Sequence, residues 1–387
     1  MHETTRTLQL RARAKPGALL LLVASGLVLA GCGASATPTP TRTPRPMVTP
    51  TPTATIEPTA TPVPPTPTPL PENVNPLTGE VVDDSSVLDR IPVGIKVSNW
   101  PARYVRPQAG INSADIIYEH YNEGYMATRW TAIFLSEDAE RVGPVRSCRL
   151  IDLQLPAIYK FVMACWGFSD GVAAIARDME DLYPNRIASY SLGEEIAPDP
   201  FFRDTTRDVP TEHTGYTSPE NVRAWAEAHG YTGRQDLSGL VFSDEPPPGG
   251  VPATYIHLPY QVLDVEWRYD EDSGRYERWS DGDVHTDYLD GEQLSAANVI
   301  VLYVPHWETD IMEDQHNNVY SLEYAIWNSN IAIIFRDGMR YDGYWQRWER
   351  TDMLTVTDED GAVIPLKVGN SFYQVIPAEG LEIAVEP

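Results

Sequence analysis

The stretch SDEPPPGGVPATY, residues 243–255, divides this sequence into two halves of different character. Its consecutive prolines and paired glycines interrupt helices and central strands, because proline lacks a backbone N–H donor and glycine favours turns. Before this break, strand-like runs alternate with helix-like runs. After it, alternating apolar and polar residues with frequent turn signals dominate. We therefore predict two domains, over residues 72–243 and 250–387.

The half before the break predicts an α/β domain with a mixed sheet. The strand-like runs are IPVGIKVSN (91–99), TRWTAIFLS (128–136) and KFVMACWG (160–167). Helix-like patterns cover residues 112–121, 148–159, 170–183 and 218–230. We expect Ser147 and Ser218 to cap the helices that follow them, because a serine hydroxyl accepts from the free N–H groups of a first helical turn.

The half after the break predicts a smaller, mainly antiparallel β domain. QVLDVEWRYDEDSGRYERWSDG, residues 261–282, has two alternating runs around DEDSG, which indicates a hairpin. Turn signals such as RDG, YDG and DEDG then recur about every ten residues. We expect HWETDIMEDQH, residues 306–316, to be a solvated loop between strands. The predicted class is therefore α+β or α/β.

The N-terminus has the order of a bacterial lipoprotein signal, which we assign to residues 1–31. A basic start precedes the apolar run PGALLLLVASGLVLAG, which is too short for a stable membrane span. It ends in LAGC, residues 29–32, where the cysteine thiol of lipoproteins takes a diacylglycerol. An ordinary signal peptide with an incidental cysteine is the alternative. We expect lipidated Cys32 to anchor the chain to the outer side of the cell membrane.

Residues 32–71 consist largely of Thr-Pro repeats, which cannot build a core. Alternating proline favours extended polyproline II, at about 3.1 Å per residue. We therefore predict a disordered, semi-rigid stalk between the lipid and the folded body.

The chain is strongly acidic, with a formal net charge of -26. Residues 1–31 carry +3 and residues 32–71 carry +1, so the folded body carries -30. Such a body repels nucleic acid, which we exclude as a partner. Any bound anion needs a local cluster of cations.

Cys148 and Cys165 are the two cysteines of the folded body. Their spacing permits a disulfide between them in an oxidising compartment. We favour the other interpretation, in which both are small buried apolar side chains. A catalytic thiol would need a histidine partner, and no recognisable spacing supplies one.

The sequence contains no GxSxG, SxxK, HExxH, GxGxxG or P-loop pattern, so we assign no catalytic residue. DEDSG and DEDG lack the remaining ligands of a calcium loop. Histidines near carboxylates lack the spacing of a structural zinc site. We therefore expect neither a metal nor a cofactor.

Polar and charged side chains are densest between residues 99 and 149. The candidate ligand-binding residues are Asn99, Arg106, Gln108, Asp115, Glu119, Glu123, Arg129, Arg146, Ser147 and Arg149. Arginine suits bidentate capture of carboxylate or phosphate. A helix beginning at Ser147 would add free N–H donors.

These residues lie in an ordered series of motifs, NPLTGE, VGIKVSN, RPQAGINSADIIYEHYNEG, TRWTAIF and GPVRSCR. The series resembles the DUF3048 family, the YerB-like bacterial lipoproteins. In the second half, YDEDSGRYERW, VHTD, NVIVLYV and FRDG resemble that family's C-terminal domain. The family's EGG.TR and RSAR patterns stand here as EGYMATR and RSCR. The resemblance spans roughly residues 75–377 and implies a lipoprotein with two domains, without implying a reaction.

Three hypotheses for function follow. The first is a binding or scaffolding protein that holds an anionic or polar envelope ligand, such as a cell-wall glycan or a peptide, at the arginine-rich site. The second is an envelope hydrolase that uses Asp115, Glu119 or Glu123 as acid or base beside Arg129 or Arg146. The third is a purely structural network of ion pairs among the same side chains.

Overall fold

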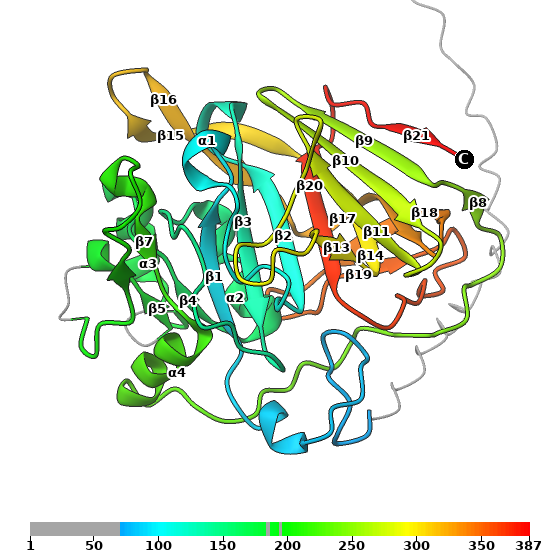
Figure 1. Ribbon diagram of the computed structural model, residues 1–387, viewed down its shortest axis with the longest axis horizontal. Coiled ribbons are helices and arrows are strands. Elements are labelled where there is room, and N and C mark those ends of the chain that lie inside the picture. Colours follow the sequence, from blue (N-terminus) through cyan, green and yellow to red (C-terminus); the bar gives the residue numbers. More distant parts are fainter. Residues whose placement is uncertain (1–69, 183–185, 193–195) are drawn as a thin grey trace, which may run out of the picture. The chain divides into compact units, whose positions relative to one another are not determined.

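Strands from both halves of the sequence pair into one mixed sheet of eleven strands in the computed structural model, which describes residues 70–182, 186–192 and 196–387 (Figure 1). The order across this sheet is β19 (Thr355–Thr357), β18 (Met339–Arg347), β17 (Asn328–Arg336), β14 (Asn298–Val304), β20 (Ser371–Pro377), β2 (Ile116–Tyr121), β3 (Thr128–Phe134), β1 (Val93–Ser98), β4 (Val162–Ala164) and β5 (Ile187–Ala188), with β8 (Val251–Pro252) paired to β18.

The centre of this sheet is a parallel trio, in which β20 lies between β14 and β2. Residue Tyr373 of β20 pairs with Ile300 of β14 and with Tyr118 of β2. The rings of Tyr118 and Tyr373 stack with centroids 4.5 Å apart. β2 is buried along its whole length, as expected of a parallel strand covered on both faces. The N-terminal and C-terminal halves therefore share one core.

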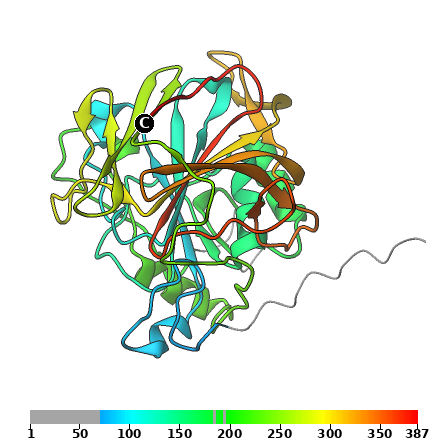
Figure 2. The same cartoon turned by 90° about the vertical axis from the view of Figure 1, so that its right-hand side faces the viewer.

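A second sheet contains the predicted hairpin around DEDSG, which is confirmed as β10 and β11. Its strands are β12 (Asp283–Val284), β11 (Arg275–Ser280), β10 (Leu263–Asp270), β9 (Tyr255–Tyr260) and β21 (Ala384–Glu386), with β13 (Ser295–Ala296) paired to β11. Trp267 of β10 packs edge-to-face on Phe372 of β20, with ring centroids 4.9 Å apart. Figure 2 shows the C-terminal end of the chain beside this sheet, where β21 pairs with β9.

Helices are few and short. The α-helices are α1 (Ala102–Val105), α2 (Leu155–Tyr159), α3 (Asp170–Asp178) and α4 (Pro219–Ala228), and the 3₁₀-helices are η1 (Ser85–Leu88), η2 (Glu123–Tyr125), η3 (Leu150–Leu153), η4 (Tyr190–Leu192) and η5 (Thr211–His213). The predicted cap of α4 is confirmed, because the Ser218 hydroxyl accepts from the N–H of Asn221 at 3.1 Å. The fold class is confirmed as well: an α/β region on a mixed sheet precedes a mainly antiparallel region.

Three local predictions are wrong. Residues 112–121 contain strand β2 where a helix was expected, since a strand buried on both faces lacks the alternation that identifies exposed strands. Residues 148–159 form η3 and then α2, and the cap of η3 is Arg149 rather than Ser147. Residues 306–316 form most of a hairpin where a solvated loop was expected. The paired strands of this hairpin are β15 (His306–Asp314) and β16 (Val319–Tyr324).

The remaining two strands, β6 (Phe202–Arg203) and β7 (Gly215–Tyr216), pair with each other. No helix among the described residues is both long and apolar enough to cross a membrane. The predicted signal segment, the lipidation site Cys32 and nearly all of the predicted stalk lie outside the described residues.

Candidate functional site

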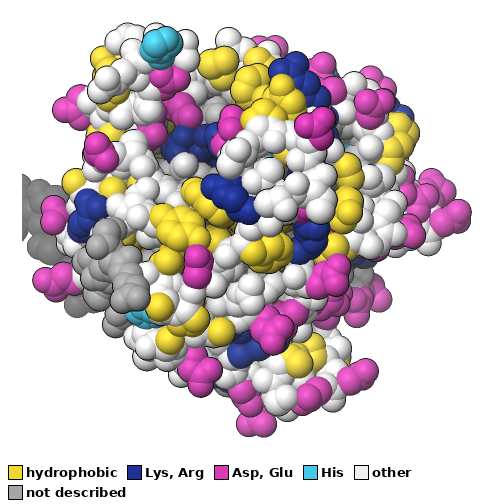
Figure 3. Space-filling model, turned by 60° about the vertical axis from the view of Figure 1, so that its left-hand side comes forward, with side chains coloured by type: hydrophobic (Ala, Val, Ile, Leu, Met, Phe, Trp, Pro, Cys, Tyr) yellow, Lys and Arg dark blue, Asp and Glu magenta, His cyan; other side chains and the backbone are white. Residues whose placement is uncertain are grey.

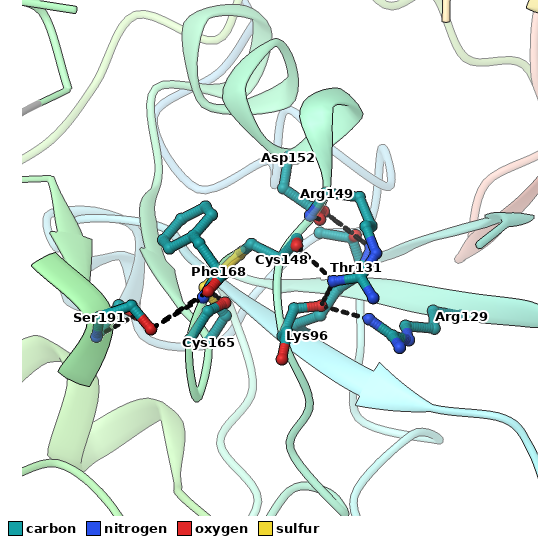
Figure 4. The surroundings of a disulfide bond; sticks show 12 residues. Lys96, Arg129, Thr131, Cys148, Arg149, Asp152, Cys165, Phe168 and Ser191 are labelled. Carbon is teal, nitrogen blue, oxygen red and sulfur yellow. Dashed lines mark hydrogen bonds and ion pairs between the residues drawn. A yellow bond between two sulfur atoms is a disulfide. The ribbon is translucent and has the colours of Figure 1, made fainter. Parts of the chain in front are cut away.

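A disulfide joins Cys148 and Cys165, so the expectation of two free buried thiols is wrong (Figure 4). Their Cα atoms lie 5.7 Å apart, and both side chains are buried in the main core. The bond ties the loop before η3 to the end of β4. The two cysteines are 17 residues apart in the sequence. In the chain-entropy model, a disulfide that closes a loop of this length stabilises the folded state by about 3 kcal/mol.

Two arginines share one carboxylate beside this disulfide. The Arg149 Nε donates to Glu123 Oε2 at 2.5 Å, and Nη2 of Arg129 donates to Glu123 Oε1 at 3.4 Å. Arg129 is on β3, Glu123 is in η2, and Arg149 immediately precedes η3. The Ser147 carbonyl accepts from Arg129 Nη1 at 2.8 Å and from Arg149 Nη1 at 3.4 Å. Ser147 thus contributes its carbonyl to the cluster, where the sequence predicted a hydroxyl cap.

Arg146 completes this arginine cluster, which we define as Arg129, Arg146 and Arg149. The Arg146 side chain is half-buried, and its Nη1 donates to the carbonyl of Glu212 at 3.1 Å. Within the described part of the chain, no carboxylate lies within ion-pairing distance of its guanidinium. Glu313 of β15 approaches Arg149 at 3.8 Å. The two carboxylates of the cluster, Glu123 and Glu313, therefore pair with Arg129 and Arg149 and leave Arg146 without an ion pair among the described residues.

The excess of positive charge in the cluster perturbs its ionisation. Burial and the neighbouring Arg149 charge lower the pKa of Arg129 to about 9. The same two causes lower the pKa of Arg146. Burial alone would raise the pKa of Glu123, but the charges of Arg129 and Arg149 hold it well below its usual range. An additional negative charge at this place would favour the charged form of each arginine.

A buried lysine that the sequence analysis did not single out lies behind the cluster. Lys96 of β1 donates to Asp152 Oδ1 at 2.9 Å and to Thr131 Oγ1 at 3.0 Å, and its Nζ also contacts the His120 ring. Asp152 in turn accepts from the backbone N–H of Arg149 at 2.6 Å. Burial lowers the pKa of Lys96 to about 8, although Asp152 opposes this shift. The signal in the sequence was a single lysine within the apolar run VGIKVS.

Three other candidate residues belong to a separate, fully buried network. Glu119 Oε2 forms an ion pair with Nη2 of Arg278 at 2.9 Å, and both side chains are 0% exposed. Asn99 Nδ2 donates to Glu119 Oε1 at 2.9 Å, and Gln108 Nε2 donates to Asn99 Oδ1 at 3.1 Å. The Gln108 Oε1 atom accepts from His285 at 2.8 Å. This network joins the two halves of the sequence inside the core.

The last two candidates have structural partners elsewhere. Asp115 accepts from Asn75 Nδ2 at 2.5 Å and from the N–H of Leu135 at 2.5 Å, and burial raises the pKa of its carboxyl. Arg106 donates to Asp281 at 2.7 Å and to the Ser280 hydroxyl at 2.7 Å, both in or beside β11. The structure thus brings together Glu123, Arg129, Arg146, Ser147 and Arg149, and it separates the other five candidates from them.

Two family models match the two halves of the sequence. Residues 77–232 match the family model "Protein of unknown function (DUF3048) N-terminal domain", and residues 256–372 match the corresponding C-terminal domain. The chain belongs to the DUF3048 family. In this chain, the arginine cluster lies within the residues that match the N-terminal domain. The buried Glu119–Arg278 pair connects the N-terminal domain to the C-terminal domain.

Two comparisons with a Bacillus subtilis protein agree with this membership. The DUF3048 chain is 28% identical over 306 residues to "Putative lipoprotein YerB" of Bacillus subtilis (strain 168), covering 78% of this chain and 86% of that protein. The crystal structure of the YerB protein from Bacillus subtilis superimposes with a TM-score of 0.66 at 25% identity, covering 80% of this chain and 99% of that one.

Proposed function

We propose that this DUF3048 protein is an extracytoplasmic lipoprotein that binds an anionic envelope ligand at the arginine cluster. Two observations support the anchor: the LAGC pattern at residues 29–32, and the description of the Bacillus subtilis relative as a lipoprotein. In this proposal, acyl chains on Cys32 hold the protein at the membrane, and residues 32–71 act as a spacer for the folded body. Two or more chains give stable anchoring, at about 0.8 kcal/mol per buried CH₂.

One observation carries the binding role: Arg129 and Arg149 are ion-paired with Glu123 and Glu313, whereas Arg146 near them has no carboxylate partner among the described residues, within a body of charge -30. In such an acidic protein, surplus cations beside one another are costly unless an anion joins them. Figure 3 shows lysine and arginine side chains among acidic side chains on one face of the molecule.

Within the cluster, Arg146 is the residue that we expect to contact the ligand. Arg149 already donates to Glu123 and to the Cys148 carbonyl, and Arg129 already donates to the Ser147 carbonyl. Arg146 is the most exposed of the three and keeps donors beyond its single bond to Glu212. Its planar guanidinium suits bidentate contact with a carboxylate or phosphate group.

The purely structural alternative makes a different prediction for the same residue. We would incubate the full chain, solubilised in mild detergent, with washed cell-wall fragments and measure the fraction that sediments. Arg146→Ala is expected to weaken this binding by about tenfold or more, which is the loss of one charge-assisted contact. Arg146→Lys keeps the charge but loses the planar fork, so it should bind with intermediate affinity.

Arg268→Ala is the matched control, because Arg268 is an exposed arginine whose partner, Glu266, lies on the same strand. It should leave both sedimentation and the melting temperature unchanged. A binding site is contradicted if Arg146→Ala lowers the melting temperature by several degrees and leaves the sedimented fraction as in the unmodified chain. That result would assign the cluster to the ion-pair network alone.

A further inference from the structure

A cavity of about 720 Å³ opens where three adjacent parallel strands of the main sheet, β14, β20 and β2, end. β2 ends at Tyr121, β14 at Val304 and β20 at Pro377, and all three run in the same direction. The residues that line the cavity are Tyr121, Tyr125, Pro259, Gln261, Pro305, His306, Asn330, Pro377, Ala378, Glu379, Gly380 and Leu381. They therefore include the last residue, or the residues that follow it, of each parallel strand.

This position is the one at which sheets with parallel strands bind ligands. The chain leaves each parallel strand at the same edge, and its connections must diverge from there, so a crevice remains outside the carboxyl ends. Here the chain turns into η2 after β2, into β15 after β14, and toward β21 after β20. The volume lies within the usual range of small-molecule sites, about 300–1,000 Å³.

The lining selects a ligand that is neutral and rich in hydroxyl groups. Tyr121 and Tyr125 present aromatic rings, in edge-to-face contact with centroids 5.5 Å apart. The side chains of Gln261 and Asn330 offer both donors and acceptors, and Glu379 offers only acceptors. No lysine or arginine is among these lining residues, so an anion would meet the Glu379 carboxylate without a compensating cation.

His306 is one of the residues that line this cavity. Its Nδ1 lies 2.6 Å from the carbonyl of Val304, so Nδ1 carries the proton and donates it. The Nε2 atom is then unprotonated and carries a lone pair. This buried atom has no hydrogen-bond partner among the described residues.

Two further features lie at or near the residues that line the cavity. Tyr125 has a φ of 55°, in the left-handed region that bulky residues seldom occupy. Trp307 and Trp327 are 45% and 37% exposed, and their rings lie 6.3 Å apart. Trp307 follows His306 directly, and Trp327 precedes Asn330 by three residues. Exposed indole rings that lie near each other are typical of binding surfaces.

We infer that this cavity binds a neutral oligosaccharide of two or three sugar rings. The Tyr125 ring packs against an apolar face of the sugar, while the side-chain amides of Gln261 and Asn330 and the Glu379 carboxylate take its hydroxyl groups. This site is separate from the arginine cluster, and the inference does not depend on the anionic ligand proposed there.

Isothermal titration of the full chain in mild detergent tests the inference with three probes: chitotriose, cellotriose and maltotriose. At least one is expected to bind with a Kd below about 1 mM. Tyr125→Ala should weaken that binding about tenfold or more, as expected for removal of a buried aromatic contact. Tyr288→Ala is the matched control, since Tyr288 is 58% exposed and lies outside the cavity. It should leave the Kd within about twofold.

The same titration of Arg146→Ala separates the two proposals. If the Kd for the sugar is unchanged in this variant, the two sites are independent. This holds even if the arginine cluster does not bind cell-wall fragments. A sugar affinity lost in Arg146→Ala but retained in Tyr125→Ala would overturn the inference. So would the absence of heat from all three sugars up to about 10 mM, or binding of a Thr-Pro peptide of residues 50–60 in their place.

Hydrogen exchange of the unmodified chain keeps the test independent of how well Tyr125→Ala folds. With saturating trisaccharide, backbone amides of residues 121–125 and 378–381 are expected to exchange at least about threefold more slowly. Protection confined to other segments would place the sugar elsewhere and overturn the assignment.

Discussion

Replacing Glu119 with glutamine is expected to destabilise the folded chain by about 3–5 kcal/mol, because it leaves the Arg278 charge buried without its partner. The Glu119–Arg278 ion pair spans 2.9 Å, and both side chains are 0% exposed. Glutamine has almost the same shape as glutamate, so the substitution removes a charge while creating hardly any cavity. The predicted loss is a large part of the 5–15 kcal/mol that stabilises a typical protein.

The hydrogen bonds around Glu119 add to this cost. Its carboxylate accepts from Asn99 at 2.9 Å, from the Thr128 hydroxyl at 2.6 Å and from Gln374 at 3.1 Å. A glutamine side chain offers one acceptor oxygen and an NH₂ group, so one of the two amide donors must face another donor. An unsatisfied buried donor costs about 1–3 kcal/mol, which places the total at the upper end of the range.

Urea unfolding followed by tryptophan fluorescence measures this effect. With a slope of about 3 kcal/mol per M, the midpoint should fall by roughly 1–1.7 M. Glu266→Gln is the matched control, since Glu266 forms a surface pair with Arg268 at 2.7 Å. Its cost should stay below about 1 kcal/mol.

A double variant decides whether the unpaired charge is the cause. Adding Arg278→Met to Glu119→Gln removes the orphaned cation, so the double variant should be more stable than Glu119→Gln alone. The reasoning is refuted if Glu119→Gln costs less than about 1 kcal/mol, or if the double variant is the less stable of the two.

Three further predictions follow from the same structure. Burial lowers the pKa of His306 to about 4, below its value of 6.5 in the unfolded chain. As the pH falls, the unfolded chain therefore binds a proton at this histidine before the folded chain does. The free energy of unfolding should thus fall by about 3 kcal/mol between pH 6.5 and pH 4. In His306→Gln, the urea midpoint should depend less on pH across this range than in the unmodified chain. An equal dependence on pH in both proteins would contradict the assignment. Replacing both Cys148 and Cys165 by alanine should lower the free energy of unfolding by about 3 kcal/mol. A reductant should destabilise the unmodified chain to the same extent. It should leave the urea midpoint of the variant unchanged. Cys32→Ala should move the protein from the membrane fraction to the soluble fraction on cell fractionation, and a variant that stays with the membrane would rule out lipid attachment at this residue.

The elements that the sequence predicted correctly are those with local signals. Ser218 followed by Pro219 identifies the start of α4 because capping depends only on adjacent residues. The DEDSG turn identifies the β10–β11 hairpin for the same reason. β2 was missed because its burial depends on what packs against both faces of the sheet: every residue of IIYEHY is buried, so its sequence does not alternate between apolar and polar residues.

Only the part of the candidate site whose residues are near one another in the sequence could be predicted. Glu123, Arg129 and Arg149 are close in the sequence and prove to be close in space. The partner of Glu119, by contrast, is Arg278 in the other half of the chain, and nothing local connects the two. A single sequence without its relatives cannot distinguish an arginine that awaits a ligand from one that meets a carboxylate more than a hundred residues away.

The segment that follows β2 connects the two proposed sites. Glu123 pairs with the arginine cluster, and Tyr125, two residues later, lines the cavity. Between them, Gly124 has a φ of 68°, so this turn holds both side chains through an uncommon backbone conformation. Gly124→Ala would strain the turn, and Val319 lies 3.0 Å from the position of the added Cβ atom. Because both sites depend on this turn, the substitution should weaken ligand binding at both, whereas Arg146→Ala and Tyr125→Ala should each affect only one.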